Sequence, residues 1–404
     1  MKAISHTSIG CWIASLVCLF AITLLPPIAA GQTAAQNAVV QNAQNIRIGF
    51  NGPNKQLPYM VPFYAASEKY YQSIGSTMPG NRMCHGYLSW DIAEQPVGSG
   101  EINREGTRAW LEDWLKHAQG QCDEALLTFK YIDGVSKGKG FPTPADFEAA
   151  FKMFQSISWG YTGWKGSFAF TAWNEPNNGA PSGDGMTVQV DPKLAADYYL
   201  AVRKYCIPKA CLVAAGDFAS NGRMGDDFIQ NCQHDLATPC GNATYMDRYK
   251  YSIANDAASY GLGTGTAFRP EVFAYHGWDD INDYIKRSPG CDNVNDHHCT
   301  TWQVVRSLST EDWSHSAIWD TEVGAGQNPQ TNPDPITQAC AASFLLRLSA
   351  TASSRITRIY YTRPYENDGE HWSLFTGPGM PKPAFTVLAD RDTSYAPPNN
   401  KKCP

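Results

Sequence analysis

Short apolar runs alternate with longer amphipathic stretches along most of the chain. Each run is only four to seven residues long, which suits a strand better than a helix. The nearly continuous apolar character of the runs is typical of a parallel sheet that is covered on its outer face. We therefore expect eight strands, at residues 46–50, 84–90, 125–130, 168–173, 211–216, 272–276, 317–320 and 356–361.

The stretches between the runs carry helix signals. Thr143-Pro144, Asp191-Pro192 and Asp334-Pro335 each place an N-cap residue before a proline at the first helical position. The first of these helices has an apolar face at residues 147–154, where phenylalanine and alanine recur with helical spacing. Further helices are expected at residues 107–118, 194–205, 246–260, 302–308 and 336–349.

The order of elements is strand, then helix, throughout. Eight such units close a barrel at about the length available, so the pattern predicts a single α/β domain, a (β/α)8 TIM barrel over residues 46–404. An open doubly wound sheet or a division into two domains is less compatible with eight regularly spaced runs. The proline-rich tail, residues 377–404, is expected to wrap the barrel.

The first 30 residues are typical of a secretory signal peptide. Lys2 precedes an apolar run from about Ile9 to Leu25, and small residues follow around Ala29. The alternative, an uncleaved membrane anchor, is disfavoured because the run is short for a span. We expect a secreted or periplasmic protein, a flexible lead at residues 31–45 and no stable membrane insertion after cleavage.

The cysteines indicate disulfide bonds. Two of the 12 lie in the signal peptide, and the other ten form an even set in a chain bound for an oxidising compartment. Three close pairs would each clip a short loop, and the remaining four would pair at longer range: Cys206 with Cys211, Cys232 with Cys240, Cys291 with Cys299, and then Cys84, Cys122, Cys340 and Cys403. A zinc site around Cys291, His297, His298 and Cys299 is the rival, but its spacing fits no common zinc signature. We expect no metal and no cofactor.

Charge limits the classes of partner. The formal net charge is −6 and no basic run is present, which argues against nucleic acid or an anionic membrane surface. Aromatic residues make up 12% of the chain, which is compatible with a sugar-binding surface but is also common in large cores. The sequence leaves the oligomeric state open.

Two glutamates follow apolar runs at equivalent points. In a (β/α)8 barrel the active site is built at the carboxyl ends of the strands. The fourth run leads into Asn174-Glu175-Pro176, and the seventh leads into Thr321-Glu322-Val323. Strands four and seven face each other across the mouth of the barrel, so we expect the carboxyl groups of Glu175 and Glu322 to meet.

Such a pair is the requirement of glycoside hydrolysis. One carboxyl group must be protonated to release the leaving oxygen, and the other must be ionised to attack the anomeric carbon. A separation of roughly 5 to 5.5 Å leads to retention of configuration, whereas a wider gap leaves room for a water molecule and leads to inversion.

The stretch Trp173-Asn174-Glu175-Pro176 resembles the acid/base motif of glycoside hydrolase clan A, a superfamily of retaining enzymes on (β/α)8 barrels. The resemblance implies that Glu175 is the acid/base, that Asn174 binds the substrate 2-hydroxyl and that Glu322 is the nucleophile. Tyr275-His276 is similar to the clan's sixth strand, where a His or Tyr contacts the substrate or the nucleophile.

The eighth strand departs from the commonest clan pattern. Tyr360-Tyr361-Thr362-Arg363 stands where a Trp often lies, which leaves Tyr361 as a substrate contact and Trp372 as the candidate sugar platform. Trp90 and Lys130 also end or follow strands and are candidate substrate-binding residues. Asn51, Asp91, Tyr131 and Asp217 lie at similar positions, and Trp278 can either stack on a sugar or pack in the core.

Each candidate has a plainer interpretation. Asn-Glu-Pro is also an ordinary strand-to-loop turn, and His276 can be a satisfied core histidine. Asp320 competes with Glu322, because period-two alternation puts both side chains on the same face of the strand. We prefer Glu322 for its match to the clan.

The sequence thus predicts a retaining glycoside hydrolase that cleaves β-linked bonds in an extracellular poly- or oligosaccharide. A transglycosylase that uses the same two glutamates is one alternative, and a secreted carbohydrate-binding protein without turnover is another. A serine hydrolase is disfavoured because no Gly-x-Ser-x-Gly pattern is present.

Overall fold

The computed structural model describes residues 27–404, except 53, 96–104, 138–139, 159–163, 179–188, 207–210, 221–244, 264–268, 288–290, 292–298, 311, 326–332, 363, 365–372, 378 and 399–400.

Eight parallel strands close into a barrel in the order in which they occur along the chain. Every strand predicted from the sequence is confirmed to within two or three residues at its ends. The strands are β1 (Arg47–Asn51), β2 (Met83–Ser89), β3 (Glu124–Lys130), β4 (Ser167–Thr171), β5 (Leu212–Phe218), β6 (Val272–His276), β7 (Ala317–Val323) and β8 (Ile356–Thr362). The predicted (β/α)8 TIM barrel is therefore confirmed.

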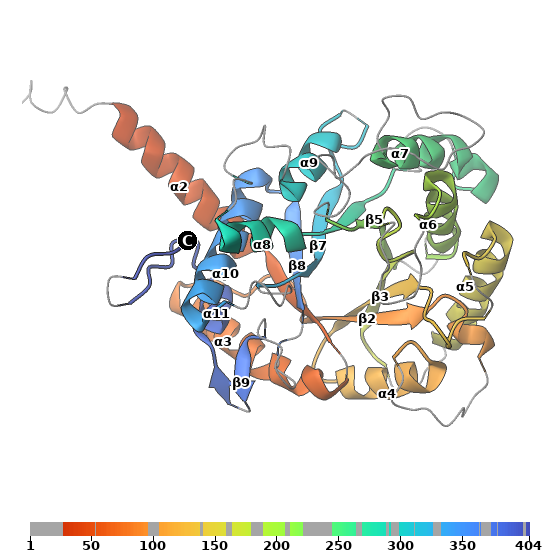
Figure 1. Cartoon of the computed structure of the whole chain (residues 1–404), viewed down its shortest axis with the longest axis horizontal. Coiled ribbons are helices and arrows are strands. Elements are labelled where there is room, and N and C mark those ends of the chain that lie inside the picture. Colours follow the sequence, from red (N-terminus) through yellow and green to blue (C-terminus); the bar gives the residue numbers. More distant parts are fainter. Residues whose placement is uncertain are drawn as a thin grey trace, which may run out of the picture.

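Helices form the outer layer of the barrel, as Figure 1 shows. Those predicted from the sequence are α4 (Arg108–Ala118), α5 (Pro144–Ser158), α6 (Pro192–Cys206), α7 (Tyr245–Asp256) with the 3-10 turn η4 (Ala257–Tyr260), α9 (Thr300–Ser307) and α10 (Pro335–Ala352). The sequence did not predict α3 (Met60–Ser73), α8 (Trp278–Lys286) and α11 (Pro383–Ala389), the 3-10 turns η1 (Asn54–Tyr59) and η2 (Ile92–Glu94), or the small hairpin of β9 (Phe375–Gly377) and β10 (Met380–Pro381).

The three predicted cap-proline helix starts are confirmed. Thr143 accepts a hydrogen bond from the backbone of Asp146, and Asp191 accepts from the backbone of Lys193. Asp334 accepts from two backbone amides at the start of α10. Each cap satisfies donors that the first helical turn leaves free.

At residues 31–45, where a flexible lead is expected, the structure has a helix. These residues belong to the helix α2 (Pro27–Asn45), which projects from the barrel in Figure 1. The stretch is rich in alanine and glutamine, both good helix formers, and has no proline after residue 27. The end of the helix is attached to the barrel, since Asn42 donates to the backbone of Ala350 in α10 at 3.0 Å. No helix within the described ranges is long and apolar enough to cross a membrane.

Four disulfides join the described cysteines. Cys206–Cys211 and Cys291–Cys299 are the predicted short clips, and Cys84–Cys122 and Cys340–Cys403 are the longer pairs. Cys232 and Cys240 lie outside the described residues. The Cys340–Cys403 bond ties the tail to α10, and α11 of the tail packs on α10 and α3, so the expected wrapping of the barrel is confirmed.

The lower part of the barrel interior is apolar and tightly filled. Inward-pointing side chains from successive strands form one cluster: Met83, Leu126, Ala169, Ala214, Val272, Ala274, Trp319 and Tyr360. Such layers make a (β/α)8 interior a packed core rather than a channel. Functional side chains are consequently confined to the upper layer, at the carboxyl ends of the strands.

Candidate active site

A connected layer of polar side chains lies above the apolar core. His85 Nε2 is 2.8 Å from the Thr128 hydroxyl, which in turn contacts the Thr171 hydroxyl. Thr171 donates to Asp217 Oδ2 at 3.2 Å, and Thr321 donates to Asp217 Oδ1 at 2.6 Å. All five residues are fully buried. Because each is hydrogen-bonded, this layer holds Asp217 rigidly beneath the mouth of the barrel.

Glu175 lies just past the end of β4 in an unusual backbone conformation. Its φ of 45° is in the left-handed region, which side-chain-bearing residues rarely adopt. Its side chain has two partners: Oε1 is 2.9 Å from His276 Nδ1, and Oε2 accepts a hydrogen bond from Asn178 at 2.8 Å. The carboxyl group is thereby fixed at the mouth.

Glu322 is brought to the mouth by an irregularity in β7. Tyr275 of β6 pairs with Asp320, whereas the next residue, His276, pairs with Glu322, so Thr321 is an extra residue in β7. Such a bulge re-aims the side chains around it. Thr321 turns inward to Asp217, and Glu322 reaches the mouth, where its side chain is 14% exposed.

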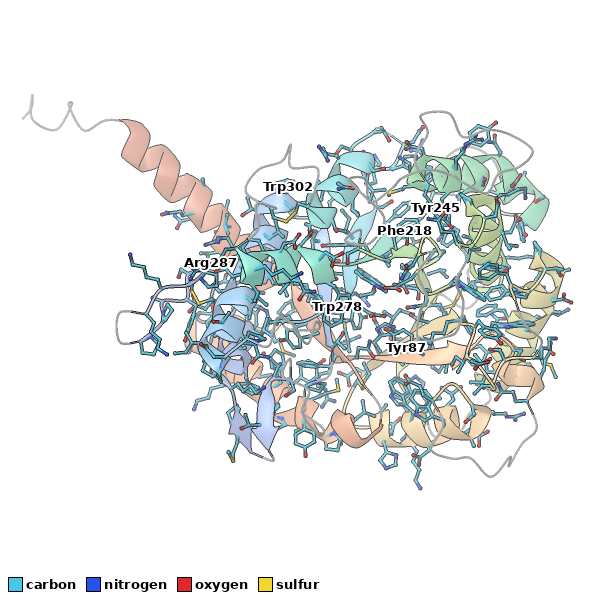
Figure 2. The ribbon with its side chains drawn as sticks, in the orientation of Figure 1. Tyr87, Phe218, Tyr245, Trp278, Arg287 and Trp302 are labelled. Atoms are coloured by element: carbon cyan, nitrogen blue, oxygen red, sulfur yellow. A yellow bond between two sulfur atoms is a disulfide. The ribbon has the colours of Figure 1, made fainter. Side chains whose placement is uncertain are left out.

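Each oxygen of Glu322 has an aromatic donor. The Tyr87 hydroxyl, on β2, donates to Oε1, and the indole Nε1–H of Trp278, at the start of α8, donates to Oε2 at 3.2 Å. Both residues are labelled near the centre of Figure 2. Asn51 donates to the Tyr87 hydroxyl at 2.7 Å, and the Lys130 amine lies 4.7 Å from the centre of the Tyr87 ring. Three strands and one helix therefore fix the orientation of a single carboxylate.

The two glutamates meet, as the sequence predicts. One carboxylate oxygen of Glu175, one of Glu322 and a ring nitrogen of His276 all lie within 4.8 Å of one another. His276 is fully buried between them, with Nε2 3.4 Å from Asp217 Oδ1 and 3.6 Å from Glu322 Oε1. One imidazole ring thus contacts three carboxylates.

This arrangement shifts the proton affinities of the site. Burial lowers the pKa of His276, but the charges of Glu322 and Asp217 and the hydrogen bond with Glu175 outweigh it, so the pKa lies well above its ordinary value. Burial raises the pKa of Glu175, yet the hydrogen bonds from His276 and Asn178 leave it below its ordinary value. Burial raises the pKa of Glu322, and the charge of Glu175 adds to the rise. In the empty site the proton next to Glu175 therefore rests on His276.

Asp320 is excluded from the mouth. Its neighbours Trp319 and Thr321 point into the barrel, so Asp320 points outward, where its Oδ1 accepts from the Gly277 amide at 2.9 Å. Burial disfavours the ionised form and raises the pKa of Asp320 well above its ordinary value. The expectation that Asp320 and Glu322 share a face is wrong because the bulge at Thr321 breaks the alternation.

Three predicted substrate-binding residues face elsewhere. The Tyr275 hydroxyl lies 3.0 Å from the Thr301 hydroxyl of α9, since the alternation that turns His276 inward turns Tyr275 outward. The Tyr361 hydroxyl accepts from the Ala325 amide at 3.3 Å and is buried against the helix layer. Trp90 is 4% exposed beneath the Lys137 amine and has no open face for a sugar. Tyr275 and Tyr361 point away from the mouth and Trp90 is covered, so we do not propose them as substrate contacts.

The other predicted substrate-binding residues are Asn174, Lys130 and Trp372. Asn174 lies beside Glu175 with its side-chain oxygen buried and without a hydrogen-bond partner among the described residues. Lys130 lies at the mouth, half-buried over Tyr87. Trp372 falls outside the described residues.

Two residues that organise the site were not assigned these roles from the sequence. Tyr87 falls on the inward face of β2, two positions beyond His85, and strict alternation along that strand could have found it. Asp217 lies in β5, one residue beyond the run predicted from the sequence, where the sequence suggests only a lining residue. Its position under His276 depends on a register shift in β5 between Gly216 and Phe218, which has no sequence signal.

Among the residues that the structure describes, two groups bring side chains of metal-ligand types close together. Glu175, His276 and Glu322 form one, but Glu175 and His276 are hydrogen-bonded to each other, and both oxygens of Glu322 accept aromatic donors. Asp280, Cys291 and Cys299 form the other, and the disulfide uses both sulfur atoms. The observed contacts of both groups are thus explained without an ion.

No protein-family model and no curated protein matches this sequence. Several solved structures are similar to it. A family 5 xyloglucanase from Paenibacillus pabuli has 13% identity and a TM-score of 0.46, with 86% of this chain and 98% of that one covered. A broad-specificity GH5 endoglucanase from Clostridium acetobutylicum has 12% identity and a TM-score of 0.47 over 88% and 98% of the two chains. A family 26 endo-β-1,4-mannanase from Cellulomonas fimi has 13% identity and a TM-score of 0.45 over 90% and 74%.

The resemblance to clan A is one of fold. The closed parallel barrel is the basis of this fold resemblance. Within the barrel, Glu175 follows β4 and Glu322 lies on β7. At these levels of identity the neighbours' substrates are their own.

Proposed function

We propose that this protein is a retaining glycoside hydrolase, with Glu175 as acid/base and Glu322 as nucleophile. The observation that carries the proposal is the pair of carboxylates within 4.8 Å of each other at the mouth of the barrel. This spacing fits a double displacement, because an inverting enzyme needs a gap of about 6.5 to 9.5 Å for a water molecule.

In the first step an oxygen of Glu322 attacks the anomeric carbon. The bond from that carbon to the leaving oxygen breaks, and Glu175 gives its proton to the leaving oxygen. The donors from Tyr87 and Trp278 hold the Glu322 oxygens in a fixed direction before attack. A prearranged carboxylate avoids the cost of reorientation in the transition state.

In the second step water attacks the anomeric carbon of the glycosyl ester. Glu175, now ionised, takes the proton of the water, and the carbon–oxygen bond to Glu322 breaks. The unpaired side-chain oxygen of Asn174, buried beside Glu175, is placed to accept a hydrogen bond from a sugar hydroxyl. Such a contact supports the role that the clan motif implies for Asn174.

The proposed substrate is a β-linked poly- or oligosaccharide outside the cytoplasm. Four disulfides among the described cysteines support an oxidising location. A carbohydrate-binding protein without turnover would not need one imidazole between two opposed carboxylates. A transglycosylase would use the same site, and transfer products formed with added sugar acceptors would reveal it.

Release of reducing sugar from a panel of β-linked polysaccharides tests the proposal. Wild type is expected to hydrolyse at least one, Glu322→Gln to have no turnover, and Glu175→Gln to lose about 10²- to 10⁴-fold. Asp320→Asn is the matched control, because it changes a buried carboxyl group two residues from Glu322 that points away from the mouth, and it should keep its activity. Undiminished rates in Glu175→Gln or Glu322→Gln would refute these roles. Equal glycan binding by all variants without turnover would favour the binding protein.

A further inference from the structure

The surroundings of His276 fix which of its nitrogens carries a permanent proton. Nε2 faces two carboxylate oxygens, Asp217 Oδ1 at 3.4 Å and Glu322 Oε1 at 3.6 Å. A bare nitrogen lone pair there would point at two anions, which is unfavourable in a buried site. Nε2 must therefore carry a hydrogen, and Nδ1 is the nitrogen that gains and loses a proton, against Glu175 Oε1 at 2.9 Å.

The two anions at Nε2 behave differently during turnover. In the proposed mechanism Glu322 loses its charge when it becomes a glycosyl ester. Asp217 is fully buried beneath the mouth, accepts hydrogen bonds from Thr171 and Thr321, and has its pKa lowered: burial raises it, but the charge of His276 and its hydrogen bonds outweigh burial. Asp217 takes no part in the bond changes, and its hydrogen bonds from Thr171 and Thr321 remain in both steps, so it keeps its charge when Glu322 loses its own.

We propose that Asp217 is a positioning residue that keeps His276 Nε2 protonated throughout turnover, so that the acid/base proton is shared by Glu175 and His276 rather than held by Glu175 alone. This inference rests on the proposed function for its catalytic meaning. Its physical content, the state of His276, can be measured without any substrate.

The proton balance is simple. In the empty site one proton resides on His276 Nδ1 and Glu175 is ionised. For the first step this proton moves along the 2.9 Å hydrogen bond to Glu175, which passes it to the leaving oxygen, and His276 becomes neutral with Nε2–H intact. In the second step the proton taken from water returns to the Glu175–His276 pair. The net charge of the site is the same in the resting state and in the glycosyl-enzyme, because Glu322 loses a negative charge as the pair gains one.

The groups that face His276 come from four other strands of the barrel. Asp217 and Glu322 contact its Nε2, Glu175 contacts its Nδ1, and Asp320 and His85 act on it from a greater distance. Burial lowers the pKa of His85 to about 4, so His85 is neutral near pH 7. Asp320 points outward to the Gly277 amide, so Asp217 is the one carboxylate against Nε2 among the described residues once Glu322 is esterified.

Nitrogen-15 NMR of histidine-labelled wild type tests this state directly, with the His276 signals assigned by their loss in His276→Gln. The expected result is that Nε2 stays protonated from pH 5 to pH 9 while Nδ1 alone titrates. A neutral ring with the hydrogen on Nδ1 at any pH in this range would overturn the proposal. This measurement needs neither turnover nor a variant of Asp217.

The pH profile of kcat/KM with Asp217→Asn tests the catalytic meaning. Removal of the negative charge lowers the proton affinity of the Glu175–His276 pair. The alkaline limb of the kcat/KM profile should therefore move to lower pH by about one unit or more. Asp320→Asn should leave that limb in place. An unmoved alkaline limb in a folded Asp217→Asn protein would overturn the proposal, since a purely structural role lowers the rate without moving the limb.

Failure of the proposed function and failure of the inference about Asp217 give different results. If wild type hydrolyses no glycoside, the proposed function fails, while the NMR titration still decides the state of His276. If wild type is active and Nε2 loses its hydrogen, the proposed function stands and the role of Asp217 falls.

Discussion

The backbone amide of Glu175 donates to the carbonyl oxygen of Asp217 at 3.0 Å, and both residues are in the left-handed conformation, with φ of 45° and 65°. Strain of this kind persists at functional sites where the surrounding structure enforces it. Here this hydrogen bond joins the chain after β4 to the end of β5, and each segment holds the other in its conformation. The position of the Glu175 carboxyl group at the mouth is thereby coupled to that of the buried Asp217 carboxyl group below it.

This backbone conformation predicts different stabilities for two variants of Asp217. Asparagine tolerates the left-handed region and can keep one of the hydrogen bonds, whereas alanine does neither. We expect Asp217→Ala to be less stable than Asp217→Asn by about 1 to 3 kcal/mol in urea unfolding at pH 7. Equal stabilities would show that strain and hydrogen bonding at this position matter little.

The Tyr87 hydroxyl is predicted to set the acid limb of activity. Its hydrogen bond stabilises the ionised form of Glu322 and so opposes the rise in the pKa of Glu322 that burial causes. Attack requires the ionised form, so activity is lost as pH falls through that pKa. In Tyr87→Phe the pKa should rise further, the acid limb of kcat/KM should move to higher pH, and kcat should fall about 10- to 100-fold.

Trp278→Phe is the matched change on the other oxygen of Glu322. It removes the indole donor at 3.2 Å and keeps an aromatic ring, so kcat should fall while KM changes little. A change confined to KM in Tyr87→Phe or in Trp278→Phe would mean that the changed residue contacts the sugar rather than orients the nucleophile.

The Cys340–Cys403 disulfide is predicted to hold the tail on the barrel. Its partners are 63 residues apart, and closing a loop of that length stabilises a fold by about 2 to 4 kcal/mol. The double variant Cys340→Ser/Cys403→Ser should unfold at a lower temperature in the absence of reductant. Loss of the Cys206–Cys211 clip, which spans 5 residues, should cost less, and the reverse order would contradict this explanation.

The sequence predicts the barrel well because buried parallel strands leave a simple signal. Eight apolar runs separated by capped helices are enough to place every strand of the barrel. Helix α8 was missed because it begins at Trp278, one residue after Gly277 at the end of β6, and so leaves no loop to mark its start. Residues 31–45 have the polar composition of a flexible lead, but their alanine and glutamine also favour the helix that the structure has there.

The site was predicted in part. Glu175 and Glu322 followed from their position after strands four and seven, and His276 from the end of strand six. The errors at Tyr275 and Asp320 concern which way a side chain points, and a single extra residue in β7 decides that for Asp320. The role proposed for Asp217 was out of reach because its contact with His276 depends on a shifted register between β5 and β6, which has no sequence signal.

Covalent trapping of the nucleophile tests the central claim most directly. A 2-deoxy-2-fluoro glycoside with a good leaving group, built on the sugar that the panel assay identifies, should form the glycosyl ester faster than water can cleave it. Peptide mass spectrometry should then locate one sugar on Glu322 and none in Glu322→Gln. A sugar on Glu175 or Asp320, or an active enzyme that is never labelled, would contradict the account.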